Sequence, residues 1–113
     1  MAHQFGILDE IDPQTFFNDY TPQKYGCVSV HDEIVNDLAG KLSNMKTYFH
    51  SLSRPGQGLA YCGITIIPPE SLAFFHDAVT TSDYFQHSGG LGELAAKIRQ
   101  AMDAKKYMIH FGI

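Results

Sequence analysis

The stretch from Gly58 to Pro69, GLAYCGITIIPP, constrains the fold of this chain more than any other. It is rich in β-branched and aromatic residues, which is typical of a strand buried on both faces. A Pro-Gly turn signal precedes it. A Pro-Pro pair ends it, because proline donates no ladder hydrogen bond. We therefore predict a central strand over residues 58–67, with the other elements arranged around it.

From residue 25 onward, short apolar strands alternate with amphipathic helices. Strands are predicted over 25–30, 46–52, 58–67 and 107–113, and helices over 31–44, from Pro69 to Val79 and from Gly89 to Met102. This is the β-α-β-β-α-(α)-β order of a ferredoxin-like α+β fold, an antiparallel sheet with helices on one face. Right-handed crossovers would place strands 25–30 and 58–67 in the centre of the sheet and the other two outside them.

Residues 1–24 are predicted to be an N-terminal extension that packs on this core, within a single domain spanning 1–113. Asp12-Pro13 is a helix-start signal, so we expect a short helix over 13–20. The alternative is a different α+β arrangement in which residues 4–8 form a fifth strand.

Composition excludes several classes of partner. The net charge of -4 argues against a nucleic acid, which usually selects a basic face. No stretch approaches the roughly 20 apolar residues of a membrane span, and residues 1–10 have no signal-peptide pattern. The two cysteines, Cys27 and Cys62, are expected to be reduced, buried thiols in predicted strands. We therefore expect a cytoplasmic protein.

Strand parity divides the side chains between two faces of the predicted sheet. Ile64 and Ile66 are assigned to the helix-covered core, together with Cys62. The opposite, open face would then carry aromatic, hydroxyl, thiol and imidazole groups, which is typical of a ligand site or partner interface. The residues proposed to bind a ligand there are Cys27, Tyr48, His50, Tyr61 and His110. Alternatively, residues 1–24 simply cover this face.

The six histidines form no metal-binding motif. His50 and His110 would lie on opposite outer strands, roughly 14 Å apart, which is too far for one metal ion. No metal, cofactor or catalytic residue is predicted. Cys27 and His110 would lie on neighbouring strands, where a thiolate–imidazolium pair is one design for a nucleophile, but no third residue is identifiable.

Two functions follow from these expectations. The preferred hypothesis is a non-enzymatic binding protein that uses the open face, for a small ligand or for a protein partner, as an inhibitor or immunity-type protein blocking a basic partner would. A homodimer through this face is also expected. The alternative is a small enzyme with an open-face pocket that uses Cys27, His110 and Tyr61.

Overall fold

Six strands form one antiparallel sheet in the computed structural model, which describes residues 1–113. They are β1 (Ala2–Leu8), β2 (Val28–His31), β3 (Lys46–Phe49), β4 (Pro55–Gln57), β5 (Ile64–Ile67) and β6 (Tyr107–Phe111). Their order across the sheet is β2-β1-β6-β5-β3-β4, and every neighbouring pair is antiparallel. The fold is therefore of the α+β class.

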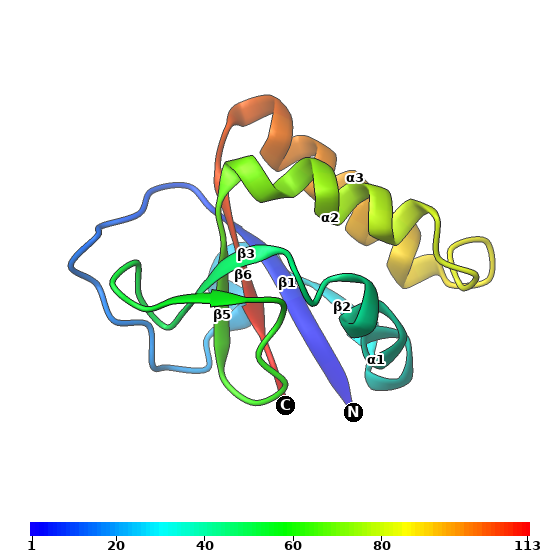
Figure 1. Cartoon of the computed structure of the whole chain (residues 1–113), viewed down its shortest axis with the longest axis horizontal. Helices are drawn as coiled ribbons and strands as arrows, with labels where there is room; N and C mark the ends of the chain where they lie inside the picture. The colour runs from blue at the N-terminus through cyan, green and yellow to red at the C-terminus, as the bar shows by residue number, and fades with distance from the viewer.

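Three α-helices pack on one face of this sheet, as Figure 1 shows. They are α1 (Asp32–Lys41), α2 (Leu72–Thr80) and α3 (Gly89–Ala104), with two short 3-10 helices, η1 (Pro22–Tyr25) and η2 (Pro69–Ser71). Local signals set where they begin: the Ser88 side chain caps α3 by accepting from the Leu91 N–H, and Pro69 opens the turn that leads into α2. None of the helices is both long and apolar enough to cross a membrane.

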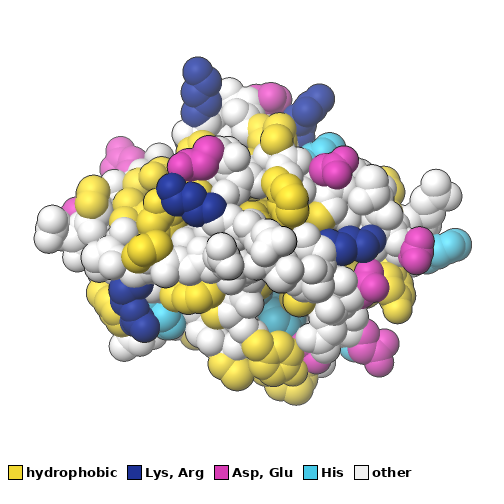
Figure 2. All heavy atoms as spheres, in the orientation of Figure 1, with side chains coloured by type: hydrophobic (Ala, Val, Ile, Leu, Met, Phe, Trp, Pro, Cys, Tyr) yellow, Lys and Arg dark blue, Asp and Glu magenta, His cyan; other side chains and the backbone are white.

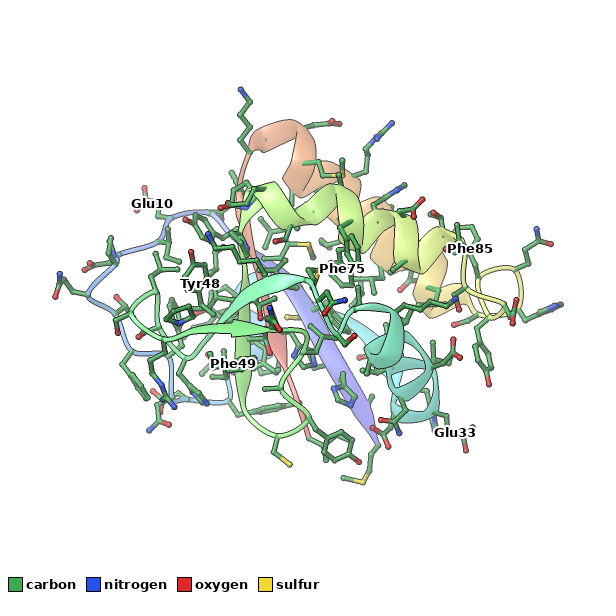
Figure 3. All side chains as sticks on the ribbon, in the orientation of Figure 1. Glu10, Glu33, Tyr48, Phe49, Phe75 and Phe85 are labelled. Carbon is green, nitrogen blue, oxygen red and sulfur yellow. The ribbon has the colours of Figure 1, made fainter.

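The main core lies between the helices and the sheet. It includes Phe5, Met108 and Ile67 from the strands, and Phe75 points from α2 toward the sheet in Figure 3. A second apolar cluster lies on the opposite face, built on Ile64, Ile66, Ile109 and Phe111 together with Leu8. The segment over residues 9–25, on the side of the sheet away from the helices in Figure 1, covers much of this second cluster.

The strand order differs from the ferredoxin-like order that was expected. Residues 2–8 belong to the sheet, where β1 pairs with both β2 and β6, so they are no extension. Predicted strand 25–30 is found as β2 at the edge, and predicted outer strand 107–113 is found as the central β6. The alternative with residues 4–8 as a fifth strand agrees with the structure at β1, where Phe5, Ile7 and Leu8 are buried. The structure adds a sixth strand, Pro55–Gln57, where a turn was expected.

The predicted central strand is shorter than expected. Only Ile64–Ile67 are in the sheet, and residues 58–63 form a loop in which Gly58 and Gly63 have φ values of +70° and +110°. Cys62 is therefore exposed rather than buried in a strand. Such backbone is easily adopted only by glycine and interrupts an extended strand.

The predicted faces of β5 and β6 are reversed. Ile64 and Ile66 pack in the cluster under the 9–25 segment, while His110 and Thr65 lie on the helix-covered side. Because all four residues of β5 are buried, both faces of this strand are apolar or enclosed. Hydrophobicity therefore gave no means of choosing between the two parities.

The expected helix over 13–20 is not formed, and residues 10–21 contain no helix or strand. Asp12 instead accepts a hydrogen bond from the Gln14 N–H at 2.8 Å, an Asx turn that competes with a helix. This irregular path lets the segment cross the open face of the sheet.

Candidate functional site

The five residues proposed to bind a ligand do not form one site. Cys27 lies above β1 on the open face, and Tyr48 lies on the same face of β3, on the side of the 9–25 segment in Figure 3. His50 follows β3 directly and contacts that segment. Tyr61 and His110 are connected through other residues on the helix-covered side. The structure thus places His50 at an open-face recess and joins Tyr61 and His110 in one network, while Cys27 and Tyr48 belong to neither.

His50 is held in an unusual backbone conformation. Its φ is +68°, a left-handed value that is uncommon for a residue other than glycine. Its N–H donates to the Ile64 carbonyl at 3.0 Å, and its own carbonyl accepts from the Phe17 N–H at 2.7 Å. Its ring Nδ1 lies 2.7 Å from the Phe17 carbonyl oxygen. These three contacts fix the ring between the sheet and the 9–25 segment.

The tautomer of His50 follows from these contacts. A carbonyl oxygen only accepts, so Nδ1 carries the hydrogen and donates it to Phe17. The neutral ring then presents an unprotonated Nε2, which is a hydrogen-bond acceptor. Nε2 has no hydrogen-bond partner within the protein and lies on the side of Gly63, where a Cβ atom would come within 2.9 Å of it.

His50 lines a recess of about 240 Å³ on the open face. We call it the His50 recess; it is lined by Asn18, Tyr20, His50, Gly63, Ile64, Phe111, Gly112 and Ile113. Tyr20 and Phe111 supply aromatic walls whose ring centroids are 5.6 Å apart. The recess therefore combines a few polar groups with apolar walls, the usual make-up of a binding site.

Two exposed aromatic side chains lie at or beside this recess. Tyr20 is 63% exposed and Phe16 is 52% exposed. The Phe16 ring stacks on His50 at a centroid distance of 5.3 Å, and the Arg54 guanidinium lies 5.7 Å from the Phe16 ring centroid. In Figure 2, hydrophobic side chains gather over the 9–25 segment and the β3–β4 hairpin, while Lys and Arg side chains stand apart from one another.

A chain of hydrogen bonds on the helix-covered side joins two fully buried imidazoles. His3 Nδ1 lies 2.8 Å from His110 Nε2, and the two rings are stacked. His3 Nε2 lies 2.9 Å from Asp32 Oδ1, and Tyr61 donates to Asp32 Oδ2 at 3.3 Å. At the other end, His110 Nδ1 lies 3.1 Å from Thr65 Oγ1. Every member of this chain has a partner.

One assignment of hydrogens satisfies the whole chain with both imidazoles neutral. The Asp32 carboxylate only accepts, so His3 donates from Nε2 and accepts at Nδ1 from His110 Nε2. His110 Nδ1 then accepts from the Thr65 hydroxyl, whose oxygen accepts from the Ala60 N–H at 2.8 Å. Burial is the main cause that lowers the pKa of His110 to about 3, and it keeps this ring neutral.

The outer end of the network is a partly exposed carboxylate. The hydrogen bond from His3 lowers the pKa of Asp32 below its ordinary value. The negative charge of Asp32 raises the pKa of Tyr61 in turn. None of the three recesses in the structure is lined by any of His3, Asp32, Tyr61 or His110. The network joins the strands that it spans.

Cys27 and His110 do not form a pair. Cys27 packs over Gly6 on the open face, whereas the His110 ring packs against Phe5 on the other side of the sheet. Burial raises the pKa of the Cys27 thiol to about 11, against a smaller opposing effect of the Lys97 ammonium. A thiol with so high a pKa is a poor nucleophile at neutral pH.

The structure brings no three His, Cys, Asp or Glu side chains together in a way that could hold a metal ion. Sequence reasoning missed His3 and Asp32, because His3 fell in the supposed extension and Asp32 fell in the predicted helix over 31–44. The alternation of His3, Phe5 and Ile7 was the available signal, since it is the period of a strand with one buried face.

Tyr20 and Phe111 were also missed as walls of the recess, since they are 91 positions apart in the chain (111 minus 20) and only the folded segment brings them together.

Comparison of this chain with protein-family models, with curated proteins and with solved structures finds no match in any of the three.

Proposed function

We propose that this protein is a small non-enzymatic binding protein whose partner is a basic protein, and that the partner places a cationic side chain such as arginine in the His50 recess. The observation that carries the proposal is the free Nε2 of His50, a fixed acceptor at the wall of an aromatic recess. A backbone conformation that is costly for histidine supports a role for this residue beyond packing.

The chemistry of the recess suits a guanidinium group. Arginine presents several N–H donors in one plane, and one of them would meet the acceptor at His50. The exposed Tyr20 ring, which packs on the buried Phe111 ring, would attract the cation through its quadrupole. Aromatic residues and arginine are also the side chains that most often dominate protein–protein binding energy.

The charge of the surrounding segment fits a basic partner. Residues 9–21 contain Asp9, Glu10, Asp12 and Asp19 and no lysine or arginine. Asp9 is paired with Lys106 at 2.8 Å, which leaves the other three carboxylates exposed and uncompensated, and Glu10 projects from the outer edge of the segment in Figure 3. Such a field steers a positively charged protein toward this face. An inhibitor or immunity-type protein would act in this way.

The enzyme alternative has less support. Its three residues are split between two faces of the sheet, and the pKa of Cys27 is raised.

Binding roles for Tyr48 and Tyr61 stay predictions. We also propose a reducing, cytoplasmic setting, which an exposed free thiol at Cys62 would suit.

The recess can be tested with a small probe. N-acetyl-arginine methylamide should shift the backbone amide signals of Tyr20, Gly63 and Gly112 saturably in an NMR titration, whereas the uncharged norleucine analogue should not. His50→Asn should abolish these shifts, because asparagine tolerates the left-handed backbone and can donate to Phe17 but lacks the Nε2 acceptor. Phe74→Ser, at an exposed position on α2, is the control that should leave them unchanged. Equal shifts with both probes would contradict the proposal.

The partner itself can be captured by placing a photo-crosslinking phenylalanine analogue at position 20 and, as a control, at position 74. A discrete adduct with a basic protein should form only from position 20, and it should weaken as salt is raised. His50→Asn should reduce its yield. Adducts that are the same from both positions, or that contain only a second copy of this chain, would rule out the basic partner.

A further inference from the structure

A second recess lies away from the His50 recess, between the N-terminal part of the chain and α3. Its volume is about 280 Å³, and its lining is mostly polar. Three ammonium groups line it, those of Lys24, Lys97 and Lys106, with one carboxylate, that of Asp9, and the side-chain amide of Gln100. We call it the lysine recess. The three lysines come from η1, from α3 and from the turn before β6, so only the fold brings them together.

The charges in this recess do not balance. Lys106 Nζ pairs with Asp9 Oδ1 at 2.8 Å, but neither Lys24 nor Lys97 has a carboxylate within ion-pair distance. Three ammonium groups and one carboxylate give a local charge of +2, in a chain whose formal charge is -4. Like charges gathered in a hollow repel one another, and an anion placed between them removes this cost.

Lys97 is directed into the recess rather than extended into solvent. It is half-buried, and its Nζ would lie 3.7 Å from a Cβ atom placed on Gly26. Gly26 has a φ of +58°, the backbone conformation that favours glycine, and the ammonium group lies beside the main chain at this residue. The same ammonium is close enough to Cys27 to act on its pKa.

We propose that the lysine recess binds a small multivalent anion that carries a phosphoryl group, such as pyrophosphate or a phosphate monoester. Such a group offers several acceptor oxygens at once, so it can meet two or three ammonium donors that come from different directions. Lysine binds phosphate as a compact point charge and needs no planar, bidentate geometry. The recess is separate from the His50 recess and shares none of its lining residues, so the inference does not rest on the proposed binding function.

Inorganic pyrophosphate is the probe for this site. Titration at low ionic strength, followed by NMR, should shift the amide signals of Gly26 and Cys27 saturably. Lys97→Ala and Lys24→Ala should each weaken binding about tenfold, the value for one lost hydrogen bond to a charged group. Lys41→Ala makes the same charge change at an exposed site on α1 and should leave the affinity unchanged. Asp9→Asn frees Lys106 and should strengthen binding.

A vesicle flotation experiment tests whether the phosphoryl group belongs to a lipid headgroup or to a free anion. Vesicles of phosphatidylcholine with phosphatidic acid should not bring the protein with them on flotation, because the recess is a hollow and the adjoining 9–21 segment is acidic. The proposal fails if pyrophosphate gives no saturable shift, or if Lys41→Ala weakens binding as much as Lys97→Ala. Flotation with acidic vesicles in the absence of pyrophosphate binding would also overturn it.

Discussion

Two histidines show how far the role of a residue depends on its surroundings. His50 is fixed by main-chain contacts and keeps one ring nitrogen free, whereas both ring nitrogens of His110 are used within the protein. A free acceptor beside a recess can bind a partner, and a fully satisfied buried ring cannot. The same residue type thus keeps a free acceptor beside a recess at one position and joins buried strands at the other.

At the residue scale, burial of His110 should make the fold sensitive to acid. Its pKa is lowered to about 3 in the folded state, so between pH 6.5 and 3 the unfolded chain binds a proton that the folded chain does not. Stability is therefore complete above pH 6.5 and falls as the pH decreases. We expect a loss of about 1.4 kcal/mol in the free energy of unfolding between pH 7.5 and 5.5 from this residue.

Urea titration at the two pH values measures this loss. His110→Gln should be less stable at pH 7.5 but should show a smaller difference between the two pH values. His87→Gln, at an exposed position, is the control and should keep the difference of the parent protein. In the parent protein the His110 ring proton signals should not move between these pH values, and a clear titration there would contradict the expectation even if the variant failed to fold.

At the element scale, β1 is the strand on which the arrangement of the sheet depends. It joins β2 to β6 and supplies His3 and Phe5 to the helix-covered side. On its other side the chain crosses it closely at Gly6, where an added Cβ atom would lie 2.7 Å from Cys27 Sγ and 2.8 Å from the Tyr25 carbonyl oxygen. The main chain at Tyr25 cannot move aside for an added methyl group, unlike the end of a flexible side chain.

Gly6→Ala should therefore destabilise the fold by about 1–3 kcal/mol, the cost of forcing an extra methyl group into a packed region. Gly40→Ala is the matched control, because Gly40 lies in α1 with open space around it. That substitution should be neutral or stabilise the protein slightly, since alanine is the better helix former. Equal denaturation midpoints for the two variants would show that the crossing at Gly6 is not close.

At the scale of the whole molecule, the open face of the sheet is not bare. The 9–25 segment covers its apolar cluster and leaves the exposed aromatic rings of Phe16 and Tyr20 beside the His50 recess. A homodimer through this face stays a prediction. The acidic residues of the segment predict how added salt should affect such a dimer. Two copies would bring like charges together, so added salt should strengthen the dimer, whereas salt should weaken the complex with a basic partner.

Sedimentation velocity at micromolar concentrations, at low and at moderate salt, tests the dimer. Tyr20→Ser should shift the population toward monomer, and Tyr84→Ser, at another exposed aromatic position, should not. A monomer at every salt concentration up to several hundred micromolar protein would exclude the dimer. It would leave the exposed aromatic rings available to a different partner.

The sequence by itself determined the class of the fold and most of its helices. The α+β class and a helix from Gly89 rest on local periodicity and capping, which depend only on residues that are close in sequence. Strand parity does not account for the place of His50, because this residue follows the end of β3 and has a left-handed φ of +68°.

Only the tertiary structure decided the strand order, the faces of β5 and β6 and the membership of both recesses. The strand over residues 64–67 is apolar on both sides, so its pattern could not tell which face the helices cover. His3 contacts His110, which is 107 positions away in the chain, and Asp32 contacts His3, which is 29 positions away. Contacts of this kind depend on which strands pair, and pairing is chosen by the summed burial of the whole core rather than by any one segment.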